Sequence, residues 1–218
     1  MSPAPQTSPA ASRLLVLGSA NRKKAAELAD LLVPLELRIE TLADFSAPLA
    51  VDEVGRSFAE NATLKATQQA AHLGRWVLGD DSGLVVDALD GAPGIFSARF
   101  AGPGATDEDN RRRLLAELDA IEPPRRTAHF VCCLALADPN GTVRAQSEGS
   151  CHGRIRREAS GAGGFGYDPL FEVVEYHRTF GELSPAVKSC LSHRARAIYR
   201  IAPQIEALID RGEWGARG

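Results

Sequence analysis

The sequence predicts an α/β protein, and three observations lead to this prediction. A short apolar run at 13–18 is followed by an amphipathic run at 23–33, the pattern of a buried strand and then a helix. The alternation recurs where a helix that opens at Ser57 precedes the apolar run Trp76–Leu78. The 218 residues, 44% of them hydrophobic and 24% charged, suit one globular domain or two lobes around one cleft.

The composition excludes several classes of protein. The formal net charge of −3 argues against a large basic surface for nucleic acid. No apolar run approaches the length of a membrane-spanning helix. The four cysteines form no Cys-x-x-Cys pair, which favours free thiols in a reducing compartment, and we expect a cytoplasmic protein.

The two ends of the chain differ from its centre. Residues 1–12 are rich in Pro, Ser and Ala, and they lack the cationic start and apolar centre of a secretory signal. We therefore predict a disordered N-terminal tail at 1–12, a folded part at 13–212 that forms one domain or two lobes around one cleft, and a C-terminal tail at 213–218.

The first strand, Arg13–Gly18, leads through a small polar turn into the first helix. This geometry offers backbone N–H groups to an anion, and Asn21 is a suitable helix cap. Lys23 and Lys24 stand in the first helical turn, where the helix dipole disfavours cations. A negative ligand would make these positions favourable, although two solvated surface lysines would give the same pattern.

The second strand is predicted at Leu35–Leu42, and a loop with Asp52 and Glu53 follows it. Ser57 with Glu60 three residues later fits a capping box at the start of the next helix. Inside this helix we interpret Asn61 as a packing residue, and Lys65 on its own would be a surface residue.

The stretch Gly79–Gly102 carries the strongest local signal for a ligand site. Asp80 and Asp81 follow an apolar run where a strand should end, and Ser82-Gly83 predicts a tight turn before the next apolar run. Ligands bind at the carboxyl ends of strands in α/β proteins, and adjacent carboxylates suit Mg²⁺. An ordinary solvated turn is the alternative.

The second half of the chain continues the alternation. A charged helix is predicted from Asp107 to Ala120, with the arginines at 111–113 on a solvated face. A hairpin follows, with strands at 128–137 and 142–149. A glycine loop with two aromatic residues spans 161–169, and the last helices begin near Pro185 and Ala195, with hydrogen-bond donors clustered around them.

Five segments, in this order, resemble the inosine triphosphate pyrophosphatase family, and the resemblance extends from Arg13 to about Ile209. The segments are Ser19–Lys24, Ser57–Ala62, Gly79–Gly102, Gly163–Pro169 and Ser192–Arg194. The resemblance implies an elongated, mixed central sheet flanked by helices, with the active site in a cleft between two lobes. It also implies a homodimer that uses Mg²⁺ and hydrolyses dITP, ITP and XTP to the nucleoside monophosphate and pyrophosphate.

The resemblance assigns roles to individual residues. Asp81 is the expected catalytic base and metal ligand, with Glu53 and Asp80 as further metal ligands. The residues expected to bind phosphate are Ser19, Ala20, Asn21, Arg22, Lys23, Lys24 and Lys65. The residues expected to contact the rest of the substrate are Ser82, Phe165, Gly166, Tyr167, Asp168, Lys188, His193 and Arg194. Relatives often have Thr at position 19 and an aromatic residue within 150–153, where this chain has Ser19 and Ser-Cys-His-Gly.

Two further expectations follow. The donors Lys188, His193 and Arg194 should read the 6-oxo group of the purine, and Lys24 and Lys65 should face Asp81 across a single crevice. Two alternatives stay open at this point: a pyrophosphatase for other modified nucleotides, and a nucleotide-binding sensor without turnover.

Overall fold

The computed structural model describes residues 13–214, so the tail predicted at 1–12 and the end of the one at 213–218 lie outside the described part. One seven-stranded sheet has the order β2-β1-β3-β4-β5-β6-β7. Strand β1 is parallel to β2 and β3, and every later pair is antiparallel, so the sheet is mixed. The strands are β1 Leu14–Leu17, β2 Arg38–Thr41, β3 Val77–Val86, β4 Thr127–Ala137, β5 Val143–Ile155, β6 Phe171–Val173 and β7 Arg178–Thr179.

The α-helices lie close to their predicted positions. They are α1 Arg22–Leu32, α2 Phe58–Leu73, α3 Asp107–Glu117, α4 Pro185–Leu191 and α5 His193–Asp210. Short 3₁₀ helices are η1 Val33–Leu35, η2 Leu42–Asp44, η3 Asp87–Leu89, η4 Gly94–Arg99, η5 Pro123–Arg125 and η6 Val174–Tyr176. No helix between residues 13 and 214 combines the length and the apolar character needed to cross a membrane.

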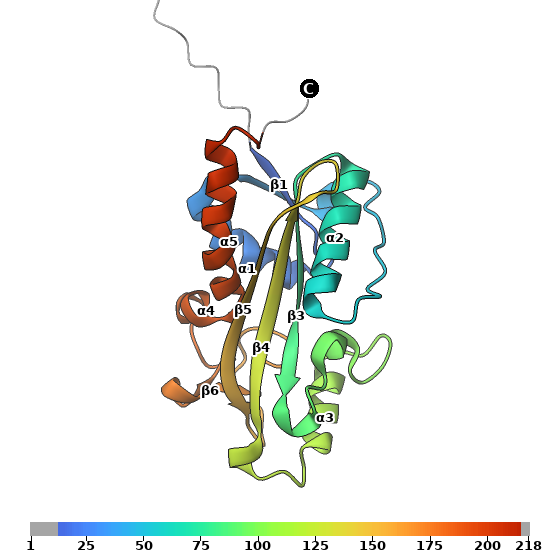
Figure 1. The fold of residues 1–218 in the computed structure, drawn as a ribbon. Coiled ribbons are helices and arrows are strands. Elements are labelled where there is room, and N and C mark those ends of the chain that lie inside the picture. Colours follow the sequence, from blue (N-terminus) through green and yellow to red (C-terminus); the bar gives the residue numbers. More distant parts are fainter. Residues whose placement is uncertain (1–12, 215–218) are drawn as a thin grey trace, which may run out of the picture.

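Three long strands, β3, β4 and β5, run the length of the molecule and connect its two lobes (Figure 1). In one lobe, α1 and α5 cover one face of the sheet, and α2 covers the other. Alternation along the strands supplies both cores: Leu78 packs with α1 and α5, and its neighbour Val77 packs with α2. In the other lobe, α3 packs on the ends of the same strands. The prediction of an elongated mixed sheet is confirmed.

The predicted turn at Ser82-Gly83 is wrong, because β3 continues through it. Strand β4 pairs with all of β3, including Asp81 opposite Cys133 and Gly83 opposite Val131. The ladder of hydrogen bonds to β4 outweighs the local turn preference of Ser-Gly, which sequence alone cannot reveal. Successive side chains of a strand point to opposite faces, so Asp80 and Asp81 face different sides of the sheet.

The other edge of β3 is open over a short stretch. Strand β1 pairs with β3 only at Val77 and Leu78. Further along, η4 approaches the edge, where the Ser97 hydroxyl accepts a hydrogen bond of 2.9 Å from the Leu84 N–H. Residues 79–83 lie between these two contacts, and this segment is called the open edge below. It lies where the two lobes meet.

Two details, at the start of α2 and at the C-terminal end, differ from the predictions. Glu60 does not close a capping box with Ser57; its carboxylate accepts from the Arg56 N–H at 2.6 Å, while Ser57 still caps the Glu60 N–H at 3.2 Å. Trp214, placed by the sequence in a C-terminal tail, is buried and stacks on Trp76 with 4.4 Å between ring centroids. The folded domain therefore extends past residue 212.

Replacing Gly79 with Ala is expected to lower the free energy of unfolding by about 1–3 kcal/mol, the usual cost of overpacking. A Cβ at Gly79 would lie 2.4 Å from the Ala62 carbonyl oxygen and 2.7 Å from the Ala66 nitrogen. Both atoms belong to the backbone of α2, which packs directly on the strand and cannot move aside cheaply. Urea unfolding would measure the effect, and an unchanged free energy would contradict it.

Candidate active site

The first turn of α1 brings one lysine to the open edge. Asn21 caps the helix as predicted, because its Oδ1 accepts from the N–H groups of Lys23 and Lys24 at 3.0 and 3.2 Å. The Lys24 ammonium donates to the Ser82 carbonyl oxygen at 3.2 Å and lies 3.9 Å from Asp80 Oδ2. Arg22 and Lys23 are exposed, so of the two lysines only Lys23 matches the alternative of a solvated side chain.

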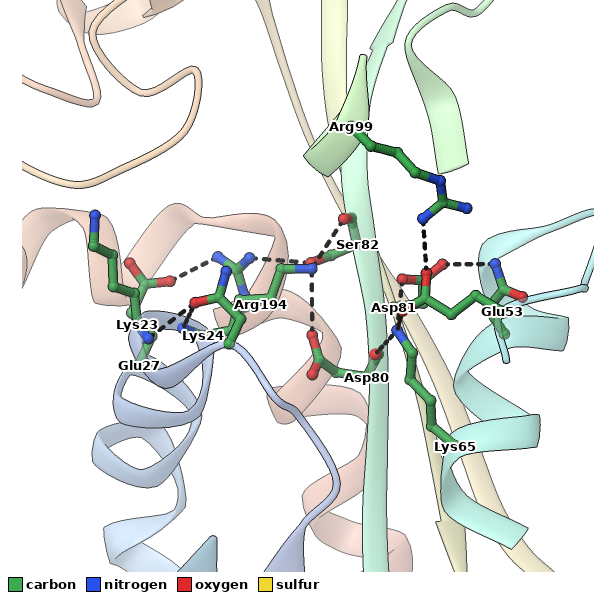
Figure 2. Close-up of polar contacts among 12 residues, drawn as sticks. Lys23, Lys24, Glu27, Glu53, Lys65, Asp80, Asp81, Ser82, Arg99 and Arg194 are labelled. Carbon is green, nitrogen blue, oxygen red and sulfur yellow. Dashed lines mark hydrogen bonds and ion pairs between the residues drawn. The ribbon is translucent and has the colours of Figure 1, made fainter. Parts of the chain in front are cut away.

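Helix α2 brings a second lysine to the same edge from the opposite face. The Lys65 ammonium lies 2.8 Å from Glu53 Oε1 and 3.0 Å from Asp81 Oδ1, and it donates to the Asp80 carbonyl oxygen at 3.1 Å. Figure 2 shows the two groups on either side of β3, with Lys24 and Asp80 on one side and Lys65, Asp81 and Glu53 on the other.

The two ammonium groups therefore meet at one strand edge. Their acceptors are the carbonyls of residues 80 and 82, which point to the same edge because alternate backbone groups of a strand do so. Two residues of extended chain span about 7 Å. One polyphosphate along this edge could contact both lysines, but they reach it from opposite faces of β3, and the single crevice shared with Asp81 stays a prediction.

The three predicted metal ligands do not form one cluster. Asp80 faces α1, whereas Asp81 and Glu53 face α2 (Figure 2). Within residues 13–214, no three His, Cys, Asp or Glu side chains gather closely enough to hold a metal ion. The grouping of Asp80 with the other two carboxylates is thus corrected, because side-chain alternation along β3 separates them.

Burial sets the electrostatics of the site. Burial lowers the pKa of Lys24, against the pull of Asp80. Burial raises the pKa of Asp81 above its ordinary value, and Lys65 only partly opposes this. For Lys65 itself, burial lowers the pKa, but Asp81 and Glu53 outweigh it and the net direction is up. The site thus holds a carboxylate that binds a proton more readily than usual beside two cations.

Asp80 is a buried carboxylate without a hydrogen bond. Its side-chain oxygens find no hydrogen-bonding partner anywhere in the described chain, and the residue is 1% exposed. Burial raises its pKa, but Lys24, Arg194 and Lys65 together outweigh burial and bring the pKa below its ordinary value. Asp80 is therefore ionised and attracts the cations around it.

A pocket adjoins the lysine side of the open edge. The lining residues include Lys24, Ser82, Asn110 and Phe130, together with the predicted contacts Phe165, Gly166, Tyr167, Asp168, His193 and Arg194.

Charged side chains form a network between this pocket, which Asp168 and Arg194 line, and a neighbouring one, which Glu27 and Lys188 line. The Lys188 ammonium donates to Asp168 Oδ2 at 2.7 Å and to Glu27 Oε1 at 2.6 Å. Arg194 donates to Glu27 Oε2 at 2.7 Å and to the Ser82 hydroxyl at 3.0 Å. The Phe165 ring lies beside both cations, 5.1 Å from the Lys188 nitrogen and 5.2 Å from the Arg194 guanidinium carbon. The pocket thus presents an aromatic face next to fixed, charged donors.

Two residues near the glycine loop have structural partners. The Tyr167 hydroxyl donates to the Ser97 carbonyl oxygen at 2.9 Å, and burial raises the pKa of this phenol. Arg111 donates to the Gly166 carbonyl oxygen at 2.6 Å, so the prediction that this arginine lies on a purely solvated face is wrong. Its side chain ties α3 to the loop that carries Phe165.

His193 is a buried histidine whose surroundings oppose its charged form. It is 2% exposed and stacks on Phe130 with 4.7 Å between ring centroids. Burial first, and then the cations Arg194, Lys188 and Lys24, bring its pKa well below the ordinary value. The unfolded chain therefore binds a proton below about pH 6.5 that the folded chain excludes.

Stability is accordingly expected to fall as the pH drops below about 6.5, by up to about 1.4 kcal/mol for each pH unit from this histidine. His193→Gln should remove that part of the slope. Urea unfolding at pH 7.5 and 5.5 would measure it, with the exposed His177→Gln as the control. An equal slope in wild type and His193→Gln would contradict the assignment.

Three residues of the site were not identified from the sequence. Glu27 joins Lys188 to Arg194, Asn61 donates to Asp81 Oδ2 at 3.2 Å, and Arg99 pairs with Glu53 Oε2 at 3.5 Å. Asn61 carried a usable signal, because a polar residue of low helix propensity on a buried helix face needs an explanation. Glu27 and Arg99 offered none, since their partners are distant in sequence.

The fold and the site together define an α/β protein with two lysine ammonium groups at an open strand edge and a pocket with an aromatic face beside it. A family model described as the Ham1 family matches residues 15–204. The chain belongs to the Ham1 family.

Curated relatives and solved structures agree with this membership. The chain is 50% identical over 202 residues to a dITP/XTP pyrophosphatase of Rhodopirellula baltica, covering 93% of this chain and 97% of the relative. It is 48% identical over 184 residues to a dITP/XTP pyrophosphatase of Desulforamulus reducens, covering 84% and 91%. The structure of a HAM1 protein from Coxiella burnetii has a TM-score of 0.80 at 39% identity and covers 89% of this chain and 98% of that one.

Proposed function

We propose that this protein hydrolyses dITP, ITP and XTP to the nucleoside monophosphate and pyrophosphate. The names of its relatives support this reaction. The observation that carries the proposal is the convergence of Lys24 and Lys65 on alternate carbonyls of the open edge, with the Asp81 carboxylate beside them.

The lysines and Asp81 have separate roles, the lysines in binding the substrate and Asp81 in the chemical step. Lys24 and Lys65 bind the phosphate oxygens. Burial lowers the pKa of Lys24, so an anionic partner would stabilise its charged form. Asp81 orients the attacking water and accepts its proton, for which a raised carboxyl pKa is favourable. Positioning and charge stabilisation supply most of the rate in phosphoryl chemistry.

Mg²⁺ is the proposed cofactor, and Glu53 and Asp81 are the residues that would hold it. Both carboxylates already surround one cation, the Lys65 ammonium, and hard divalent ions take carboxylate oxygens as ligands. When bound, such an ion neutralises phosphate charge and polarises the reacting phosphoryl group. Asp80 remains the partner of Lys24 on the other face.

The purine is proposed to lie in the pocket beside Phe165, Lys188 and Arg194. The side chains of Lys188 and Arg194 can only donate hydrogen bonds, which suits the 6-oxo group of hypoxanthine and xanthine. Phe165 offers a face on which a base can stack.

We also propose a cytoplasmic homodimer. The cysteines of the described chain are all free thiols, which fits a reducing compartment. Phe96 and Tyr199 are 54% and 56% exposed, and a subunit interface would cover large apolar side chains of this kind. Sedimentation at several concentrations would measure the oligomeric state.

Pyrophosphate release from ITP, with and without Mg²⁺, tests the proposed function. Magnesium-dependent release, with inosine monophosphate as the second product, is expected. Binding of ITP without release would instead identify a sensor, and a preference for modified pyrimidine or methylated nucleotides would identify a different pyrophosphatase.

A further inference from the structure

Asn61 is a fully buried amide that links two parts of the candidate active site. It lies in the first turn of α2 and has no exposed surface. Its Oδ1 accepts from the Gly55 N–H at 2.8 Å, and its Nδ2 donates to Asp81 Oδ2 at 3.2 Å. One side chain thus contacts the loop that carries Glu53 and the carboxylate of the proposed base.

The backbone fixes the orientation of this amide. An N–H group can only donate, so the carbonyl oxygen of Asn61 must face Gly55. The amide N–H therefore faces Asp81, where it meets a carboxylate oxygen that accepts. Lys65, one helical turn further along the same face, holds the other oxygen, Oδ1, at 3.0 Å. Asp81 is thus held at both oxygens by donors from one helix.

The contact with Gly55 also positions Glu53, two residues earlier in the loop. A Cβ at Gly55 would lie 2.6 Å from Asn61 Oδ1, so the loop fits this closely only because position 55 has no side chain. The distance between Glu53 and Asp81 is therefore set partly by a single amide between them.

We infer that Asn61 is a positioning residue, which orients the Asp81 carboxylate and holds the Glu53 loop at the correct distance from it. This inference rests on the proposed function, in which Asp81 accepts the proton of water and shares a cation with Glu53. Asn61 itself contacts neither substrate nor ion.

Helix α2 provides a matched control in Gln69. This amide is 2% exposed and ties the same loop down further along, with its Oε1 accepting from the Leu49 N–H at 3.2 Å and its Nε2 donating to the Leu49 carbonyl at 2.6 Å. Gln69 does not touch Asp81. It therefore separates the effect of loosening the loop from the effect of releasing the carboxylate.

The test compares Asn61→Asp, Asn61→Ala and Gln69→Ala with the wild type at one pH. Asn61→Asp keeps an acceptor for the Gly55 N–H but presents an acceptor to Asp81. It should lower kcat by about 10–100-fold, as the loss of supporting partners does in other sites, with the KM for ITP nearly unchanged. Gln69→Ala should keep kcat even where its melting temperature falls.

Crystal structures of Asn61→Asp and Gln69→Ala give a readout that does not depend on activity. The Asp81 side chain should turn away from its wild-type position in Asn61→Asp and keep it in Gln69→Ala. An unmoved Asp81 with normal kcat in Asn61→Asp, or an equal loss of kcat in Gln69→Ala and Asn61→Ala, would overturn the inference. Absence of pyrophosphate release by the wild type would instead overturn the proposed function, while the position of Asp81 would still decide the role of Asn61.

Discussion

Replacing Asp81 with Asn is expected to lower kcat for ITP by about 10²–10⁴-fold, the usual contribution of a general base. An amide cannot take the proton of the attacking water. The fold should survive, because Asn has nearly the same volume and Lys65 keeps its ion pair with Glu53 at 2.8 Å.

Initial rates of pyrophosphate release would measure the loss, and a thermal melt would verify that the protein is folded. Asp90→Asn is the matched control, because Asp90 is exposed beyond the end of β3 and its left-handed backbone, with φ of 50°, suits Asn. An Asp81→Asn variant with near-normal kcat would remove this residue from the chemistry.

The second large effect concerns the choice of base. The kcat/KM for ITP is expected to exceed that for ATP by about 10⁴-fold, because a site built around fixed hydrogen bonds rejects a substrate that leaves them unmade. Lys188 is held by Asp168 and Glu27, and Arg194 by Glu27 and Ser82. Lysine and arginine side chains have no acceptor atom, so neither can accept from the 6-amino group of adenine, and that amino group would face two cationic donors.

Steady-state rates with ITP, XTP and ATP would measure this ratio. Lys188→Met should reduce it, since the substitution removes a donor and keeps much of the side-chain volume. A melt should accompany the rates, because Asp168 and Glu27 lose a partner in this variant. Equal kcat/KM for ITP and ATP in the wild type would refute the role of these donors.

Most helices and strands are predictable from the sequence because their signals are local. Asn21 caps α1 and Ser57 caps α2, and both follow from short-range hydrogen bonding that any chain with these residues can make. A lysine in the first turn of α1 is disfavoured by the helix dipole, and this indicated a negative partner. Lys24 indeed lies against β3 and near Asp80. Such signals need only a few neighbouring residues.

The errors share a different physical cause. Ser82-Gly83 has the composition of a turn, but pairing with β4 keeps it extended. Arg111 has the composition of a solvated helix face, but the Gly166 carbonyl lies within its reach. In each case a partner dozens of residues away in the chain decided the outcome, and no local pattern contains that partner.

The sequence by itself determined the α/β class, the family and the identity of the charged residues at the site. Only the tertiary structure decided which side of the sheet each of them faces. Asp80 and Asp81 are neighbours in the chain, yet β4 extends the strand through both, so that one carboxylate holds Lys24 and the other holds Lys65. The open edge arises in the same way, because β1 ends before β3 does and leaves two backbone carbonyls to the lysines.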